Sequence, residues 1–121
     1  MANRVMVVDD SRMQEILIRQ MLEGSGYEVA CYCRCGEEAL DQYESVQPDV
    51  VTMDIIMPGM DGLETAQAIL TEHPDARIIM VSSLAYDDTF EEAGAIGAKA
   101  FLDKPIEAEK LLAALDQAMN G

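Results

Sequence analysis

The sequence predicts an α/β fold, a doubly wound five-stranded parallel sheet between two layers of helices, which makes a three-layer sandwich. Three observations predict it. Apolar runs rich in Val, Ile and Met recur at regular intervals, segments with helical spacing lie between them, and four of the five runs are nearly continuous. Continuous apolar runs are typical of strands that are covered on both faces of a parallel sheet. Right-handed crossovers between five β-α units then give the doubly wound arrangement.

The five expected strands are the apolar runs themselves. They are RVMVV at 4–8, YEVAC at 27–31, DVVTM at 49–53, RIIMV at 77–81 and KAFL at 99–102. No linker or low-complexity tract interrupts this pattern. Because 121 residues is about the size of one domain, we expect residues 1–121 to form a single domain.

A helix is expected after each strand. In the first, the apolar residues with the spacing of an amphipathic helix are Met13, Ile16, Leu17 and Met21. The same spacing recurs at Leu63, Ala66, Ile69 and Leu70, and again at Leu112, Leu115 and Met119. The remaining helices are GEEALDQYESV at 36–46 and DDTFEEAGAIG at 87–97. Typical stop signals follow three of these segments, namely Gly24, Pro74 and Gly121.

Composition excludes several classes of function. Eight basic and 23 acidic residues give a net charge of −15, which repels the phosphate backbone of nucleic acid. No apolar run is long enough for a signal peptide or a membrane span, so we expect a soluble, cytoplasmic protein without membrane insertion. Cys31, Cys33 and Cys35 are odd in number and closely spaced, a poor disulfide framework, and we assign them no functional role.

Polar side chains follow the expected strands at the points where the strands end. They are Asp9 and Asp10 after the first, Asp54 after the third, Ser82 and Ser83 after the fourth, and Asp103 and Lys104 after the fifth. Because the carboxyl ends of parallel strands meet at one edge, these side chains should gather where ligands bind in such sheets. Asp54 ends an apolar strand as its only charge, so it needs a partner or a cation to offset its burial.

The gathered groups suit phosphoryl transfer. Three carboxylates raise one another's pKa, and a hard divalent cation such as Mg²⁺ removes that cost while binding one or two of them. Lys104 would contribute a compact positive charge for a phosphoryl oxygen, and the Ser82 hydroxyl a hydrogen bond. Phosphoryl transfer needs mainly positioning and charge neutralisation, and a carboxylate such as Asp54 can act as the nucleophile.

Four motifs carry a resemblance to a known family. They are VVDDS at 7–11, DVVTMDIIMPGMDG at 49–62, IIMVSS at 78–83 and AFLDKP at 100–105. With these motifs the whole chain resembles the receiver domain of two-component response regulators, in its stand-alone chemotaxis-type form. The resemblance implies a flavodoxin-like, CheY-like (βα)5 fold with strand order 2-1-3-4-5. It also implies a phosphorylation-dependent switch rather than an enzyme, one that catalyses only its own phosphorylation and dephosphorylation.

The resemblance implies a role for each site residue. Asp54 would accept a phosphoryl group from a histidine kinase. Asp10 would bind Mg²⁺ or Mn²⁺ directly, Asp9 would bind it through water, and Asp54 and the Ile56 carbonyl would complete the ligands.

The switch residues come from the same resemblance. Ser82 and Lys104 would close on the phosphoryl group, and the rotamer of Phe101 would report activation. An unidentified downstream protein would then bind the face made by the fourth helix, the fifth strand and the fifth helix. The peptide bond between Lys104 and Pro105 is expected to be cis, as a proline permits.

Other functions remain open at this point. A phosphorelay intermediate would use the same site. An aspartyl-phosphate phosphatase of the haloacid-dehalogenase type would want a second Asp two residues after the nucleophile, where this chain has Ile56. A flavodoxin-like electron carrier would want a hydroxyl- and glycine-rich loop after the first strand, where this chain has the acidic DDSRMQE.

Three positions raise further expectations. Ile56 and Leu84, two residues beyond Asp54 and Ser82, are apolar and should flank the phosphoryl group, where they would exclude the hydrolytic water. Cys35 precedes the second helix in place of a good capping side chain. His73, next to Pro74, is expected to interact with the C-terminal dipole of its helix.

Overall fold

The computed structural model describes residues 3–83 and 87–120, with the backbone alone for residues 87–90. The strands are β1 (Asn3–Val8), β2 (Tyr27–Cys33), β3 (Val50–Asp54), β4 (Ile78–Ser82) and β5 (Ala100–Asp103). The helices are α1 (Arg12–Leu22), α2 (Gly36–Val46), α3 (Gly62–Glu72), α4 (Asp87–Ile96) and α5 (Ala108–Asn120). Strand and helix alternate throughout, as the sequence pattern predicts.

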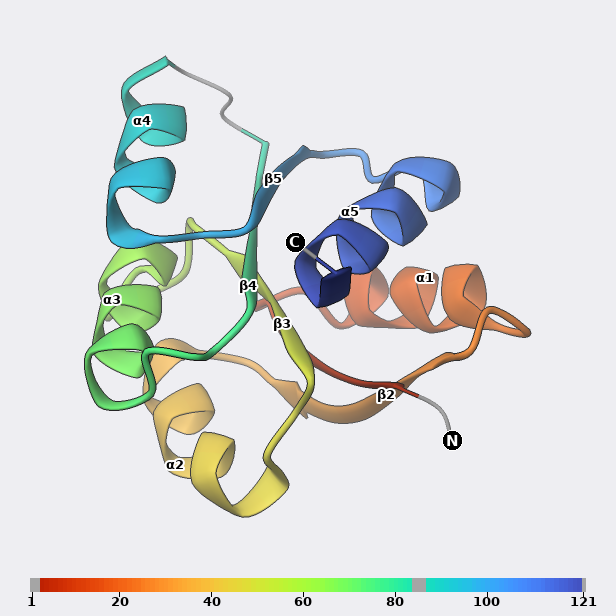
Figure 1. Ribbon diagram of the computed structural model, residues 1–121, viewed down its shortest axis with the longest axis horizontal. Helices are drawn as coiled ribbons and strands as arrows, with labels where there is room; N and C mark the ends of the chain where they lie inside the picture. The colour runs from red at the N-terminus through yellow and green to blue at the C-terminus, as the bar shows by residue number, and fades with distance from the viewer. Residues whose placement is uncertain (1–2, 84–86, 121) are drawn as a thin grey trace.

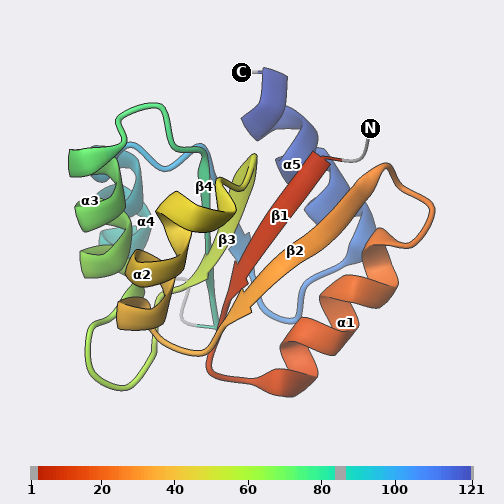
Figure 2. The same cartoon turned by 90° about the horizontal axis from the view of Figure 1, so that it is seen from below.

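The strands form one parallel sheet with helices on both faces. Its order is β2-β1-β3-β4-β5, which confirms the predicted 2-1-3-4-5 topology. Helices α1 and α5 cover one face, and α2, α3 and α4 cover the other (Figures 1 and 2). The doubly wound three-layer architecture is therefore confirmed. No helix among the described residues is long and apolar enough to cross a membrane.

Burial explains why the apolar runs are continuous. Every residue of β3 and of β4 is buried, because helices cover both faces of the central strands. Strand β2 lies at an edge and is mostly half-buried. The strands differ from the predicted runs by one or two residues at their ends. Polar residues that precede the strands still join the ladder, since the Asp49 N–H donates to the Arg4 carbonyl at 2.8 Å.

The buried face of α1 differs from the one that the spacing of apolar residues predicts. Met13, Ile16 and Leu17 are exposed by 63%, 37% and 39%, so the face that they share does not pack on the sheet. The buried positions are instead Glu15, Ile18 and Leu22, and Met21 alone of the predicted face packs against the core. Glu15 tolerates burial because Arg12 pairs with it at 3.0 Å and Arg19 pairs with it from the next turn. Apolar residues cover much of this helix, so their spacing alone does not select the buried face.

The start of α3 packs against the end of β3 without space for a side chain. The Gly62 N–H donates to the Ile55 carbonyl at 2.8 Å, and Asp61 caps the helix by accepting from the Glu64 N–H at 2.8 Å. A Cβ atom at Gly62 would lie 2.0 Å from the backbone oxygen of Asp54. This close approach holds the backbone of Asp54 in place.

Gly62→Ala should therefore lower the free energy of unfolding by about 2 kcal/mol or more, because the added methyl group meets backbone that has no room to shift. Urea denaturation followed by circular dichroism measures this change. Gly94→Ala in α4 is the matched control, since a Cβ there meets nothing within 4 Å. The control should raise stability by about 0.5–1 kcal/mol through helix propensity. Equal stabilities for the two variants would contradict the account.

Candidate functional site

Four of the predicted polar side chains meet at the carboxyl edge of the sheet. Carboxylate oxygens of Asp9, Asp10 and Asp54 all lie within 4.8 Å of one another. Asp9 and Asp54 are buried, whereas Asp10 is exposed. Lys104 follows β5 and contacts both buried carboxylates. Its Nζ lies 3.0 Å from Asp9 Oδ2 and 3.5 Å from Asp54 Oδ2. We refer to these four residues as the acidic site.

Asp9 links the acidic site to the first helix. Its Oδ1 accepts a hydrogen bond from the Ser11 N–H at 2.8 Å, while its Oδ2 faces Lys104. Ser11 is the N-cap of α1, and its hydroxyl accepts from the Gln14 N–H at 3.3 Å. This role of Ser11 was not predicted from the sequence. A serine directly before an amphipathic segment is the signal that predicts such a cap.

Lys104 is held in place by backbone as well as by charge. Its N–H donates to the Ser82 carbonyl at 2.9 Å, and its peptide bond to Pro105 is cis, as expected. Burial opposes the charge on the ammonium group. The hydrogen bond and charge of Asp9, together with those of Asp54, outweigh that effect, so the pKa of Lys104 is raised above its ordinary value.

Asp54 is destabilised in its charged form. Burial raises its pKa from 3.8 to about 6, the charges of Asp9 and Asp10 add to the shift, and Lys104 opposes it. At neutral pH the carboxylate is therefore ionised at a cost in free energy. A single lysine does not neutralise three carboxylates.

The donor set fits a hard divalent cation. Asp9, Asp10 and Asp54 provide only oxygen atoms, close enough together to share one ion. The raised pKa of Asp54 indicates negative charge in excess of what Lys104 balances. A bound cation would relieve this excess, so the residues present suit a metal site.

Comparison with known proteins agrees with this geometry. Residues 5–116 match the family model described as the response regulator receiver domain. The chain belongs to the response regulator receiver domain family. It is 40% identical over 117 residues to Protein CcdB of Bacillus subtilis (strain 168). The match covers 97% of this chain and 98% of that protein. It is 37% identical over 120 residues to Chemotaxis protein CheY of the same organism, covering 99% of this chain and 100% of that protein.

Solved structures show the same fold. A chain in the crystal structure of the CheX-CheY-BeF3-Mg²⁺ complex from Borrelia burgdorferi superposes with a TM-score of 0.93 and 30% identity. The match covers 98% of this chain and 90% of that one. The protein is therefore a phosphorylation-dependent response regulator of two-component signalling, and a signalling domain. The phosphatase and flavodoxin alternatives are not favoured.

The other residues predicted for the receiver differ in burial and in their distance from the acidic site. Ser82 ends β4 and is 1% exposed. Phe101 is half-buried and packs against the core on the side of α2, α3 and α4, so it does not join the carboxylates. Ile56 is 49% exposed, two residues beyond Asp54. Leu84 lies outside the described residues.

A further expectation concerns the start of α2 and the cysteines near it. Helix α2 begins directly after Cys35, whose side chain makes no capping hydrogen bond, and Glu37 and Glu38 stand in its first turn. Negative charges near a helix N-terminus interact favourably with its dipole. Cys31, Cys33 and Cys35 are free thiols, and burial raises the pKa of Cys33, the most deeply buried of them.

The raised pKa of Asp54 predicts a pH-dependent effect of its removal. The folded-state pKa of about 6 exceeds the ordinary 3.8, so the folded state binds more protons between these values and ionised Asp54 destabilises the fold above pH 6. Without divalent cations, Asp54→Asn should raise the free energy of unfolding by about 1–3 kcal/mol at pH 8. The gain should shrink as the pH falls through 6 and vanish near 4. Urea denaturation across this range measures it, and a gain independent of pH would contradict the shift.

Proposed function

We propose that Asp54 accepts a phosphoryl group from the phosphohistidine of a histidine kinase, and that the protein is a chemotaxis-type response regulator. The observation that carries the proposal is the position of Asp54, buried at a strand end beside Asp9, Asp10 and Lys104. The Bacillus subtilis CheY relative, matched over its whole length, supports the chemotaxis assignment. In our account residues 1–121 act as one receiver domain.

The chemistry uses the carboxylate of Asp54 as the nucleophile. One of its oxygens attacks the phosphorus of the donor, so a P–O bond forms as the P–N bond to the histidine breaks. Asp54 must be ionised for this attack, a condition met above its pKa of about 6. Lys104 stays paired with Asp9 at 3.0 Å, a position from which its ammonium group can also bind a phosphoryl oxygen.

The metal ligands of this proposal are Asp10 directly, Asp9 through water, Asp54 and the Ile56 carbonyl. When bound, Mg²⁺ would neutralise charge on these carboxylates and on the transferred group. The raised pKa of Asp54 supports this role, because it indicates that the carboxylates lack sufficient positive charge around them. Mn²⁺, which favours the same oxygen ligands, should substitute for it.

We further propose that the signal leaves the acidic site through Ser82 and Lys104. We propose that both close on the phosphoryl group and that Phe101 changes rotamer in response. Phe101 also lines a groove of about 500 Å³ between α4, β5 and α5, and two lysines, Lys99 and Lys110, stand at its walls. This groove supports the α4–β5–α5 face as the binding surface for the downstream protein, since a local charge change can bias a bistable surface.

Phosphorylation by a small phosphodonor should require Asp54. Acetyl phosphate with Mg²⁺ should add a single phosphoryl group to the wild type, and Asp54→Asn should abolish the addition. Intact-protein mass spectrometry measures it. Asp103→Asn is the matched control, because Asp103 is exposed at the same edge of the sheet but lies outside the acidic site. Labelling of the Asp54→Asn variant at the wild-type rate would exclude Asp54 as the acceptor.

The lifetime of the phosphorylated form should depend on Ile56. Its apolar side chain cannot orient a hydrolytic water, whereas an amide can. Ile56→Asn should therefore speed the loss of phosphate by about tenfold, which is about 1.4 kcal/mol of barrier. The measurement follows phosphate release after removal of the donor. Leu17→Asn, a similar change at an apolar residue that is 39% exposed on α1, should leave the rate unchanged. Equal rates for Ile56→Asn and the wild type would rule out water exclusion by this side chain.

A further inference from the structure

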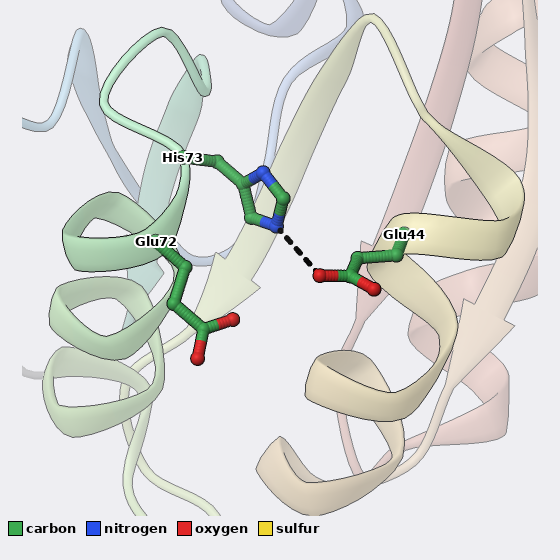
Figure 3. Close-up of side chains that lie close together, drawn as sticks. All are labelled: Glu44, Glu72 and His73. Carbon is green, nitrogen blue, oxygen red and sulfur yellow. Dashed lines mark ion pairs between the residues drawn. The ribbon is translucent and has the colours of Figure 1, made fainter.

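A second group of metal-ligating side chains lies where α2 and α3 end, away from the acidic site. Ligand atoms of Glu44, Glu72 and His73 all lie within 4.8 Å of one another. Figure 3 shows the His73 ring reaching from the end of α3 across the gap toward Glu44 on α2, with the Glu72 carboxylate in the same gap. Glu44 and Glu72 are exposed and His73 is 32% exposed, so the group is open to solvent.

The separation of the His73 and Glu44 side chains matches shared coordination better than a hydrogen bond. His73 Nε2 lies 3.6 Å from Glu44 Oε1, close enough for an ion pair when the imidazole is protonated but longer than a normal N–H···O bond. Two ligands of one tetrahedral Zn²⁺ stand about 3.4 Å apart, given bond lengths of about 2.0–2.1 Å. The two atoms are therefore already near the spacing that one zinc ion requires.

Among the residues that the structure describes, no lysine or arginine pairs directly with the carboxylates of the group, although Arg77 lines a pocket together with Glu72 and His73. Two carboxylates thus face one imidazole, and a divalent cation would neutralise both. The imidazole nitrogen favours Zn²⁺ and similar transition metals over Mg²⁺, which prefers oxygen.

The surroundings position the imidazole and leave room for a further ligand. The rings of Tyr43 and His73 lie with centroids 4.8 Å apart, so Tyr43 covers one side of the imidazole. The His73 backbone N–H donates to the Ile69 carbonyl at 2.7 Å, which fixes the residue as the C-cap of α3. A cavity of about 470 Å³ adjoins the ring and is lined also by Gln47 and Pro48. Water there can fill the fourth position of a tetrahedral ion.

We propose that Glu44, Glu72 and His73 bind Zn²⁺ and so link the ends of α2 and α3. The ligands come from two helices that pack on the same face of the sheet. Binding ties these ends together and stabilises the folded state by linkage. The site shares no residue with the acidic site, so it can be tested on the unphosphorylated full chain.

The chain contains a single histidine, which provides a specific reporter. The experiment records the imidazole nitrogen resonances of the ¹⁵N-labelled full chain by long-range ¹H–¹⁵N NMR, with free Zn²⁺ set by a metal buffer. Zn²⁺ should shift the Nε2 resonance of His73 saturably. Zinc taken up by the cysteines or by the acidic site leaves this resonance in place, so the reporter separates the sites.

Variants test whether the two carboxylates share the ion. Glu44→Gln and Glu72→Gln should each weaken the binding seen at His73 by about tenfold or more, because each removes a charged ligand and loss of even a ligand's outer partner costs about 10–100-fold. Glu109→Gln removes one exposed charge from α5 and should leave the affinity unchanged. Amide spectra without metal check that each variant is folded. An unchanged His73 resonance at saturating Zn²⁺ would overturn the proposal, and so would wild-type affinity in both Gln variants.

Discussion

Repulsion among three carboxylates, balanced in part by one lysine, is the interaction on which the rest of this structure depends. Carboxylate oxygens of Asp9, Asp10 and Asp54 lie within 4.8 Å of one another, and Lys104 contacts Asp9 and Asp54. Because Asp54 is buried, the imbalance appears as a pKa of about 6 rather than as a hydrated ion pair. A site that carries this excess negative charge favours a cation, and with it a phosphoryl group.

The fold maintains this arrangement through its backbone. Parallel strands bring their carboxyl ends to one edge, and each acid is then fixed locally. The Ser11 N–H holds Asp9, the absence of a Cβ at Gly62 lets α3 approach the Asp54 carbonyl, and the Lys104 N–H bonds to the Ser82 carbonyl. These contacts hold the acidic groups in place although their charges repel one another. The same backbone links connect the acidic site to β4 and β5, from which a charge change can reach the surface.

Much of this was predictable from the sequence, because continuous apolar runs identify buried parallel strands and their ends identify the site. Asp54 and Lys104 were found in this way. The buried face of α1 was not predicted correctly. Met13 and Leu17 have the spacing of a core face but are exposed, whereas Glu15, paired with two arginines, is buried. The contact between Glu44 and His73 depends on how α2 packs against α3, which the spacing of residues along the chain does not predict. Local periodicity thus predicts elements and strand ends, whereas contacts between helices require the tertiary structure.

The charge on Asp54 is the most direct test of the account. Titration of its carboxyl carbon by ¹³C NMR, with and without Mg²⁺, measures the pKa at the residue itself. Without Mg²⁺ we expect a midpoint of about 6. Saturating Mg²⁺ should lower this midpoint, because a bound cation stabilises the ionised form. An ordinary carboxyl midpoint of about 3.9 that Mg²⁺ leaves unchanged would contradict the central claim.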